Sequence, residues 1–313
     1  MQWHERIGRR LKLRDLHILL AVTQHGSMAK AATALAISQP AVSKAIADME
    51  HTVGLRLFDR TPHGVEATTY GLALARHGTA IFDELKQAEQ HLEFLADPTL
   101  GELRIGSSES MAAGPLPAII DRFSRRHPRV ALTVAQAVFA TAHYRELRER
   151  RIDLLMGRMF PSFEADDLQS ERLFDDQLVV VSGIRSRWTR ARRLELADLA
   201  GERWVLPPAD SLPGLSTADL FRAAGVELAG VPVTTLSIHL YVQLVATGRF
   251  VAMLPGSILR FGGRHLPVKV LPVKLPSQPR PVAIIRLRNR TLSPVAQAFI
   301  DCAKAVLSER GAP

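Results

Sequence analysis

The stretch SMAKAATALAISQPAVSKAI, residues 27–46, decides the fold of the N-terminal part of the chain. Ser27 can cap a short helix made mostly of alanines, and Ser38 can cap the helix that follows. Gln39 and Pro40 then fill the first turn of that later helix, where proline is well tolerated. A helix rich in leucine precedes the stretch and ends at a glycine. We therefore predict three short helices, the last two packed closely because their facing residues are small.

The last of these helices has one apolar and one polar face. Its spacing buries Val42, Ile46 and Met49 against the other helices. Two strand-like pieces, at 55–60 and 64–68, flank a turn signal and would form a wing beside this helix. Helices, turn and wing in this order are typical of a winged helix-turn-helix that binds double-stranded DNA. The alternative is a plain helical bundle, but such bundles usually have longer and more amphipathic helices.

The polar face of the third helix supplies the candidate DNA contacts. Glutamine and serine side chains can reach base edges, and Lys44 suits a phosphate or a guanine. Arg60 is placed for a backbone phosphate, and His63 lies in the turn of the wing. The complete set of candidates is Ser27, Ser38, Gln39, Pro40, Ser43, Lys44, Arg60 and His63.

A long helix should follow, from about residue 71 to 95, with apolar residues in a heptad pattern. Such a pattern predicts a seam between two copies of the chain. The alternative is packing within one chain, because Gly71 and Gly78 weaken the start of the pattern. Leu74, Ile81, Ala88 and Leu95 occupy one heptad position, and Leu85 and Leu92 occupy the complementary one.

Beyond residue 100, strand-like runs alternate with helical runs. Strands near 103–107, 130–136 and 152–157 are separated by helices near 115–126 and 141–150, a βαβαβ order that predicts a parallel sheet. A second alternating set covers about 177–254. Strands at 269–272 and 282–287 and a helix at 294–307 complete the α/β part of the chain.

The composition is that of an ordinary folded protein. The 313 residues are too many for one usual core, and 47% of them are apolar. A single cysteine, Cys302, excludes an internal disulfide framework and a cysteine-based metal cage. No apolar run approaches the roughly 20 residues that span a bilayer, and the start has no stretch of signal-peptide type. We expect a cytoplasmic protein without membrane contact.

The formal net charge of +9 is unevenly distributed along the chain. Residues 1–96 carry 11 basic and 10 acidic side chains, a net of +1, whereas residues 260–313 carry 10 and 2, a net of +8. The total charge is therefore a poor argument for nucleic-acid binding, and the motifs must decide. We interpret the basic excess as a solvated face. The alternative is a surface that touches DNA or an acidic partner, formed by Arg286, Arg288 and Arg290.

The sequence contains none of the common catalytic motifs. We find no nucleophile elbow, zinc-binding helix motif, phosphate-binding loop or dinucleotide glycine fingerprint. Cys302 lies on the apolar face of the last helix, where packing is the expected role. We therefore expect neither an enzyme nor a cofactor or metal site.

The N-terminal block resembles the LysR-type family of transcriptional regulators. The alternating α/β remainder extends the resemblance over nearly the whole chain, with Pro115-Leu-Pro117, Ile152-Asp153 and Met253-Leu-Pro255 as similar pieces. Departures are Met28, Met49 and His63, and the histidine removes a fixed positive charge from the wing. The resemblance rests on His25-Gly-Ser27, Ala31-Ala32, the run LAISQPAVS at 35–43, Ile46, Glu50, Gly54, LFDR at 57–60, and Thr69-x-Gly71.

The resemblance implies three parts, with boundaries near residues 70 and 98. These are a winged helix-turn-helix at 1–70, a linker and dimerisation helix at 71–98, and a two-lobed effector domain at 99–313 that is like periplasmic binding proteins. It also implies a homotetramer built from two dimers, with RNA polymerase as a further partner. The first lobe would comprise about 99–174 and 265–313, and the second about 175–264.

Ligands of open α/β sheets sit beyond the carboxyl ends of the strands, so strand ends nominate the effector contacts. Ser110, Ser211 and Ser237 also fall near positions where similar regulators contact effectors, although each could simply cap a helix. Glu109 and Asp210 disfavour a purely anionic ligand. The candidate contacts are Ser110, Gln136, Thr141, Arg158, Ser211, Ser237 and His239.

A sugar or an organic acid is therefore the expected effector. The effector half is most similar to the galactose-binding-protein-regulator group, which favours a sugar. We predict a sequence-specific transcription regulator that responds to this small molecule. A solute-binding protein without a transcriptional role is the alternative from another functional class.

Overall fold

The computed structural model describes residues 10–61, 64–136, 144–159, 165–262, 266–276 and 278–309, with the side chain of Arg60 left out. The chain divides into two compact units, Met1–Ala88 and Glu89–Pro313. Within the described residues, no helix is both long and apolar enough to cross a membrane.

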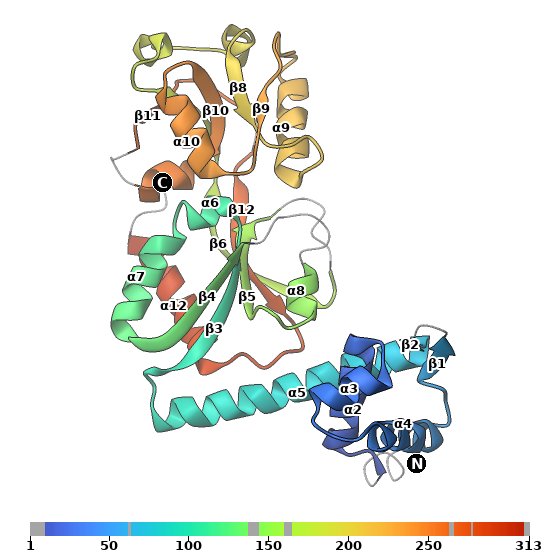
Figure 1. The fold of residues 1–313 in the computed structure, drawn as a ribbon. Coiled ribbons are helices and arrows are strands. Elements are labelled where there is room, and N and C mark those ends of the chain that lie inside the picture. The colour runs from blue at the N-terminus through green and yellow to red at the C-terminus, as the bar shows by residue number, and fades with distance from the viewer. Residues whose placement is uncertain are drawn as a thin grey trace. The chain divides into compact units, whose positions relative to one another are not determined.

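The N-terminal unit contains the three expected helices and the expected hairpin (Figure 1). Its core is formed by apolar side chains that include Leu19, Val22, Val42 and Ile46, each at most 3% exposed. The elements are α2 (Leu13–His25), α3 (Met28–Ala34), α4 (Gln39–Val53), β1 (Phe58–Thr61) and β2 (Gly64–Ala67). The long helix α5 (Thr69–Ala96) begins in this unit and continues past its last residue, Ala88.

The hairpin is attached to the helices by specific contacts. A carboxylate oxygen of Glu50, on α4, accepts hydrogen bonds from the backbone N–H groups of Leu57 (2.7 Å) and Phe58 (3.2 Å). A Cβ at Gly71 would lie 2.1 Å from the carbonyl oxygen of Leu57, so only glycine allows α5 to begin so close to β1. These contacts explain why Glu50 and Gly71 stand at these positions.

The first sheet of the C-terminal unit has the strand order β4-β3-β5-β12-β6. Strand β3 pairs in parallel with β4 and β5, whereas β12 runs antiparallel to β5 and β6. The strands are β3 (Leu100–Ser107), β4 (Arg129–Gln136), β5 (Leu154–Arg158), β6 (Leu168–Asp176) and β12 (Arg280–Leu287), and the associated helices are α6 (Glu109–Ala112), α7 (Leu116–Arg126), α8 (Tyr144–Arg148) and α12 (Pro294–Glu309).

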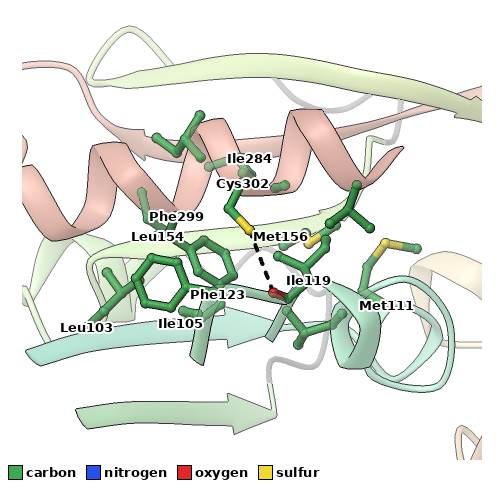
Figure 2. Packing of buried hydrophobic residues seen from close by; sticks show 14 of the residues in the cluster. Leu103, Ile105, Met111, Ile119, Phe123, Leu154, Met156, Ile284, Phe299 and Cys302 are labelled. Atoms are coloured by element: carbon green, nitrogen blue, oxygen red, sulfur yellow. Dashed lines mark hydrogen bonds between the residues drawn. The ribbon is translucent and has the colours of Figure 1, made fainter. Parts of the chain in front are cut away.

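Helices α7 and α12 pack on the first sheet and bury its main core (Figure 2). The rings of Phe123 and Phe299 meet edge to face with their centroids 5.4 Å apart. The thiol of Cys302 donates to the carbonyl oxygen of Ile119 at 3.8 Å. Burial raises the pKa of this thiol, so the structural role predicted for Cys302 agrees with its position.

The second sheet has the order β11-β7-β10-β8-β9. The chain enters it through the Asp176–Gln177 step and leaves it after β11. Its strands are β7 (Leu178–Gly183), β8 (Arg203–Leu206), β9 (Val233–Thr234), β10 (Phe250–Pro255) and β11 (Val268–Val270), and its helices are α9 (Leu212–Ala223), α10 (Ile238–Ala246), α11 (Gly256–Gly262) and the 3-10 turns Arg187–Arg190 and Leu196–Leu199.

The boundary predicted near residue 265 within this unit is wrong. The prediction places the residues that follow it in the first lobe, but β11 pairs with β7 in the second sheet. The return to the first sheet therefore comes after β11, and β12 is the strand that completes it. Strand β6 is absent from the sequence-based prediction, because it alternates polar and half-buried residues instead of forming an apolar run.

Candidate nucleic-acid interface and ligand cavity

The N-termini of α3 and α4 are fixed by serine caps. The hydroxyl of Ser27 accepts from the N–H of Lys30, and the hydroxyl of Ser38 accepts from the N–H of Ala41, each at 3.4 Å. Both serines thus satisfy helix N–H groups that would otherwise lack partners. Each keeps its own O–H as a donor, but their first role is to set where the two helices begin.

Helix α4 presents a polar surface on the side away from its core. Gln39, Pro40 and Lys44 are exposed and Ser43 is half-buried, whereas Ile46 is 3% exposed. The exposed residues therefore lie together in the first two turns of the helix. The partial positive charge of a helix N-terminus also favours a phosphate there.

The two wing candidates are only partly described. The backbone of Arg60 pairs with Val65 across the hairpin, but its side chain is not described. His63 lies outside the described residues.

A cavity of about 130 Å³ lies between the two sheets of the C-terminal unit. Four of the predicted effector contacts line it: Ser110, Gln136, Arg158 and Ser211. Ser211 is largely engaged in capping α9, because its hydroxyl donates to the carbonyl of Pro208 (2.6 Å) and accepts from the N–H of Gly214 (3.1 Å).

Two of the other three predicted contacts do not line this cavity, and the third is not described. Ser237 and His239 are not among the described residues that line it. Ser237 instead caps α10, since its hydroxyl accepts from the N–H of Leu240 at 3.3 Å. Thr141 lies outside the described residues.

Sequence reasoning missed several residues that line the cavity, of which Arg280 matters most. Arg280 is the first residue of β12. The prediction considers the carboxyl ends of strands, but β12 runs antiparallel, so its amino end meets the cavity. Ser216 and Thr217 on α9 and Tyr241 on α10 were also missed, since they lie within helices. Burial raises the pKa of Tyr241, which keeps its phenol neutral and able to donate a hydrogen bond.

Two arginines give the cavity a positive end. Arg158 donates from Nη2 to the main-chain carbonyl of Asp176 at 3.1 Å, and Arg280 donates from Nη2 to the hydroxyl of Ser216 at 3.0 Å. Burial lowers the pKa of Arg158; the negative charge of Asp176 opposes this shift and the positive charge of Arg280 adds to it. The guanidinium nevertheless keeps its positive charge, because arginine loses a proton only in strongly basic solution.

The opposite end carries hydroxyls and a carboxylate. The side-chain amide of Gln136 donates to Glu109 at 3.2 Å, and the hydroxyls of Ser108 and Ser110 lie 3.1 Å apart. All four residues line the cavity. This end can thus both donate to and accept from a polar ligand.

The basic segment 260–313 is more than the solvated face that the sequence suggests. Arg290 is 8% exposed and its guanidinium donates to the carboxylate of Asp153 at 2.7 Å. Arg288 donates to the main-chain carbonyl of Asp166 at 2.9 Å. The cation of Arg260 lies 5.0 Å from the centroid of the Phe174 ring. Much of the basic excess therefore stabilises the fold.

Comparison with protein families gives two matches that together cover most of the chain. The family model for bacterial regulatory helix-turn-helix proteins of the lysR family matches residues 13–72. The family model for the LysR substrate binding domain matches residues 96–308. The residues between the two matches lie in α5.

Curated relatives match over nearly the full length. The transcriptional regulator GbpR of Azospirillum brasilense is 28% identical over 95% of this chain and 86% of its own. The uncharacterized regulator YdcI of Escherichia coli is 27% identical over 96% of this chain and 97% of its own. The transcriptional dual regulator GltC of Bacillus subtilis is 26% identical over 93% of this chain and 96% of its own.

Solved structures of similar proteins share the fold. A full-length point variant of OxyR from Pseudomonas aeruginosa aligns with a TM-score of 0.64 at 20% identity, over 95% of this chain and 94% of its own. CbnR complexed with its target DNA aligns with a TM-score of 0.61 at 19% identity, over 95% of this chain and 100% of its own.

Proposed function

This chain belongs to the LysR family of bacterial transcriptional regulators, and from that premise we propose how it reads DNA and senses its effector. It is a DNA-binding transcription regulator with a domain for a small-molecule effector. The alternative of a solute-binding protein is not supported, because the relatives are named transcriptional regulators.

We propose that α4 is the recognition helix, with Gln39 and Ser43 at base edges and Lys44 at a phosphate or guanine. The observation that carries this proposal is the exposure of Gln39, Pro40 and Lys44 on the face opposite the buried Ile46. Ser27 and Ser38 would contribute through the helix ends that they cap, where N–H groups suit phosphates. Arg60 and His63 remain proposed contacts of the wing.

We propose that the linker, residues 71–98, joins two copies of the chain into a dimer, and that two dimers form a tetramer. Leu85 and Leu92 support the seam, since 47% and 69% of their surfaces are exposed on α5. Apolar side chains at heptad spacing gain stability when a second helix covers them. Two copies of the segment 1–70 would then read two half-sites.

We propose that the effector binds in the cavity between the two sheets of the segment 99–313. Ser110, Gln136, Arg158 and Ser211 support this site because they come from separate elements and line one cavity. A ligand that contacts both sheets favours their closed arrangement and thereby shifts the population of regulator states. A sugar and an organic acid both suit the mixture of hydroxyls and charges.

The full-length chain would be tested by selecting its binding sites from a pool of random duplex DNA. We expect an enriched pair of half-sites roughly one helical turn, or a multiple of it, apart. The variant Lys44→Gln should reduce the salt dependence of binding by about one counterion per protomer. If no DNA sequence is enriched, and if Lys44→Gln does not change the salt dependence of binding, α4 is not the recognition helix.

A further inference from the structure

We propose that the effector is a compact hydroxy acid, with one carboxylate at the two cavity arginines and hydroxyl groups at Glu109 and its neighbours. This inference rests on the proposed function, in that it takes the cavity between the sheets as the effector site. It narrows the ligand from a sugar or organic acid to a molecule that combines one negative charge with hydroxyl groups.

The polar residues of the cavity follow the order of strands in the first sheet. Gln136 ends β4, Glu109 follows β3, Arg158 ends β5 and Arg280 begins β12. These strands are consecutive neighbours in the order β4-β3-β5-β12, and the pairing register brings these ends to one edge. Neighbouring strands lie about 4.8 Å apart, so β3 and β5, which lead to Glu109 and Arg158, are roughly 5 Å apart, and β4 and β12, which carry Gln136 and Arg280, are roughly 14 Å apart.

The basic end favours an anion. The Nε of Arg158 is buried and has no hydrogen-bond partner among the residues that the structure describes. A second guanidinium, Arg280, lies close enough to lower the pKa of Arg158. A buried charged donor without a partner is costly, and two cations side by side repel each other. A carboxylate placed between them would satisfy Nε and neutralise the repulsion, because the planar guanidinium matches its two oxygens.

The negative charge of Asp176 acts on Arg158 more strongly than the positive charge of Arg280 does, but the carboxylate of Asp176 does not bind the Nε of Arg158. One carboxylate oxygen accepts from the N–H of Ser257 at 3.0 Å, and the other accepts from the hydroxyl of Ser257 at 2.6 Å. Asp176 reaches Arg158 through its main-chain carbonyl, and it is not among the described residues that line the cavity. Arg158 therefore keeps capacity for a ligand.

The acidic end limits the ligand to one carboxylate. The charged residues that line the described cavity are Glu109, Arg158 and Arg280, which sum to a formal charge of +1. A second carboxylate near Glu109 would meet like charge. Hydroxyl groups, in contrast, can donate to Glu109 and accept from Gln136 or Ser110. The apolar residues Ile238 and Met253 also line the cavity and would suit the carbon skeleton of such a ligand.

The test is calorimetric titration of the full-length protein with two matched series of probes. The first is 4-hydroxybenzoate, benzoate, which lacks the hydroxyl, and 4-hydroxybenzamide, which lacks the charge. The second is gluconate, neutral glucose and the dicarboxylate glucarate. We expect a hydroxy acid of at least one series to bind more than about 10-fold tighter than each of its analogues, the effect of losing a charge-assisted hydrogen bond. The proposal would be overturned if neither series showed this preference for its hydroxy acid, or if neither hydroxy acid bound at millimolar concentration.

Variants identify the groups that read the ligand. Arg280→Gln should weaken the bound hydroxy acid by about 10-fold or more, and Glu109→Gln should remove the discrimination against glucarate. Arg172→Gln is the matched control, because this exposed arginine on β6 pairs with Asp175 away from the cavity. Thermal unfolding of each variant distinguishes the loss of a ligand contact from the loss of the fold. Arg280→Lys should bind the hydroxy acid more tightly than Arg280→Gln, because lysine keeps the positive charge.

DNA binding, measured on the same samples, distinguishes the two levels of the proposal. If the protein binds DNA specifically but prefers neutral ligands, only the proposal that the effector is a hydroxy acid is contradicted. Loss of sequence-specific DNA binding would contradict the proposed function itself.

Discussion

Arg158 and Asp176 are joined by a hydrogen bond of 3.1 Å that runs from the cavity to the main chain between the two sheets. Asp176 ends β6, and the chain passes from there into the second sheet. Its carboxylate is held in turn by Ser257 at the start of α11. A ligand that binds Arg158 is therefore linked through one hydrogen bond to Asp176, where the chain passes from the first sheet to the second.

The Asp176–Ser257 contact should contribute both to stability and to the effector response. In Ser257→Ala, a buried carboxylate oxygen loses its hydroxyl donor, so the free energy of unfolding should fall by about 1–3 kcal/mol. Urea unfolding measures this change, and effector titration should show an altered affinity. Ser308→Ala is the control, since this exposed hydroxyl only meets the carbonyl of Ala305 and should change stability by less than about 0.5 kcal/mol. Equal stability of both variants would contradict the role given to Ser257.

Gln39→Ala should reduce discrimination between specific and random DNA. Loss of a base-edge contact costs about 1–3 kcal/mol for the specific site and little for random sequence, because phosphate contacts remain. Fluorescence anisotropy with both duplexes at one salt concentration measures the ratio. Gln169→Ala, an exposed change on β6, should leave this ratio unchanged. If Gln39→Ala keeps the full ratio, this residue does not read bases.

Much of the N-terminal fold could be predicted because its signals are local. Ser27 and Ser38 cap helices within three residues, and Gly54 ends α4 in a left-handed conformation with a φ of 75°. Such features depend only on neighbouring residues, so they can be recognised in the sequence. The candidates on the polar face of α4 followed from the same helical periodicity.

The cavity was harder to predict because it depends on strand direction and on pairing between distant segments. Arg280 meets Arg158 only because β12 pairs antiparallel with β5, a strand that lies far earlier in the chain. Arg290 resembles a surface cation in the sequence, but its pairing with Asp153 is another long-range contact. Ser237 lies at the predicted strand-to-helix turn and caps α10, but it is not among the described residues that line the cavity.

Leu85→Asp combined with Leu92→Asp should dissociate the proposed dimer. Both leucines are exposed in the single chain, so charges there should leave each chain folded. A coiled-coil seam, in contrast, cannot bury a cluster of aspartates from two chains. Sedimentation velocity should show monomers, with unchanged helix content by circular dichroism. Glu89→Gln, on an exposed position of the same helix, should remain oligomeric; dimers in the double variant would place the seam elsewhere.

Asp153 should make the stability of the C-terminal unit depend on pH. Burial tends to raise its pKa, but the hydrogen bonds from Arg104 and the charges of Arg290 and Arg104 outweigh burial and hold the pKa below its usual value. A lowered carboxylate pKa stabilises the fold above the unfolded value of about 3.9, and this contribution is lost as pH falls through the folded value.

Asp153→Asn should therefore cost about 3–5 kcal/mol near pH 7, because it removes a carboxylate counter-charge from the buried cation of Arg290. The difference from the natural protein should begin to shrink below about pH 4, where Asp153 of the unfolded chain takes up its proton. It should vanish at lower pH, as the pH falls through the lowered pKa of Asp153 in the folded protein. Urea unfolding at pH 7 and at several lower values would show this convergence. Asp121→Asn breaks an exposed pair with Arg125 and should change stability by less than about 1 kcal/mol at every pH. A constant difference for Asp153→Asn across the pH range would mean that the ion pair does not set the acid sensitivity.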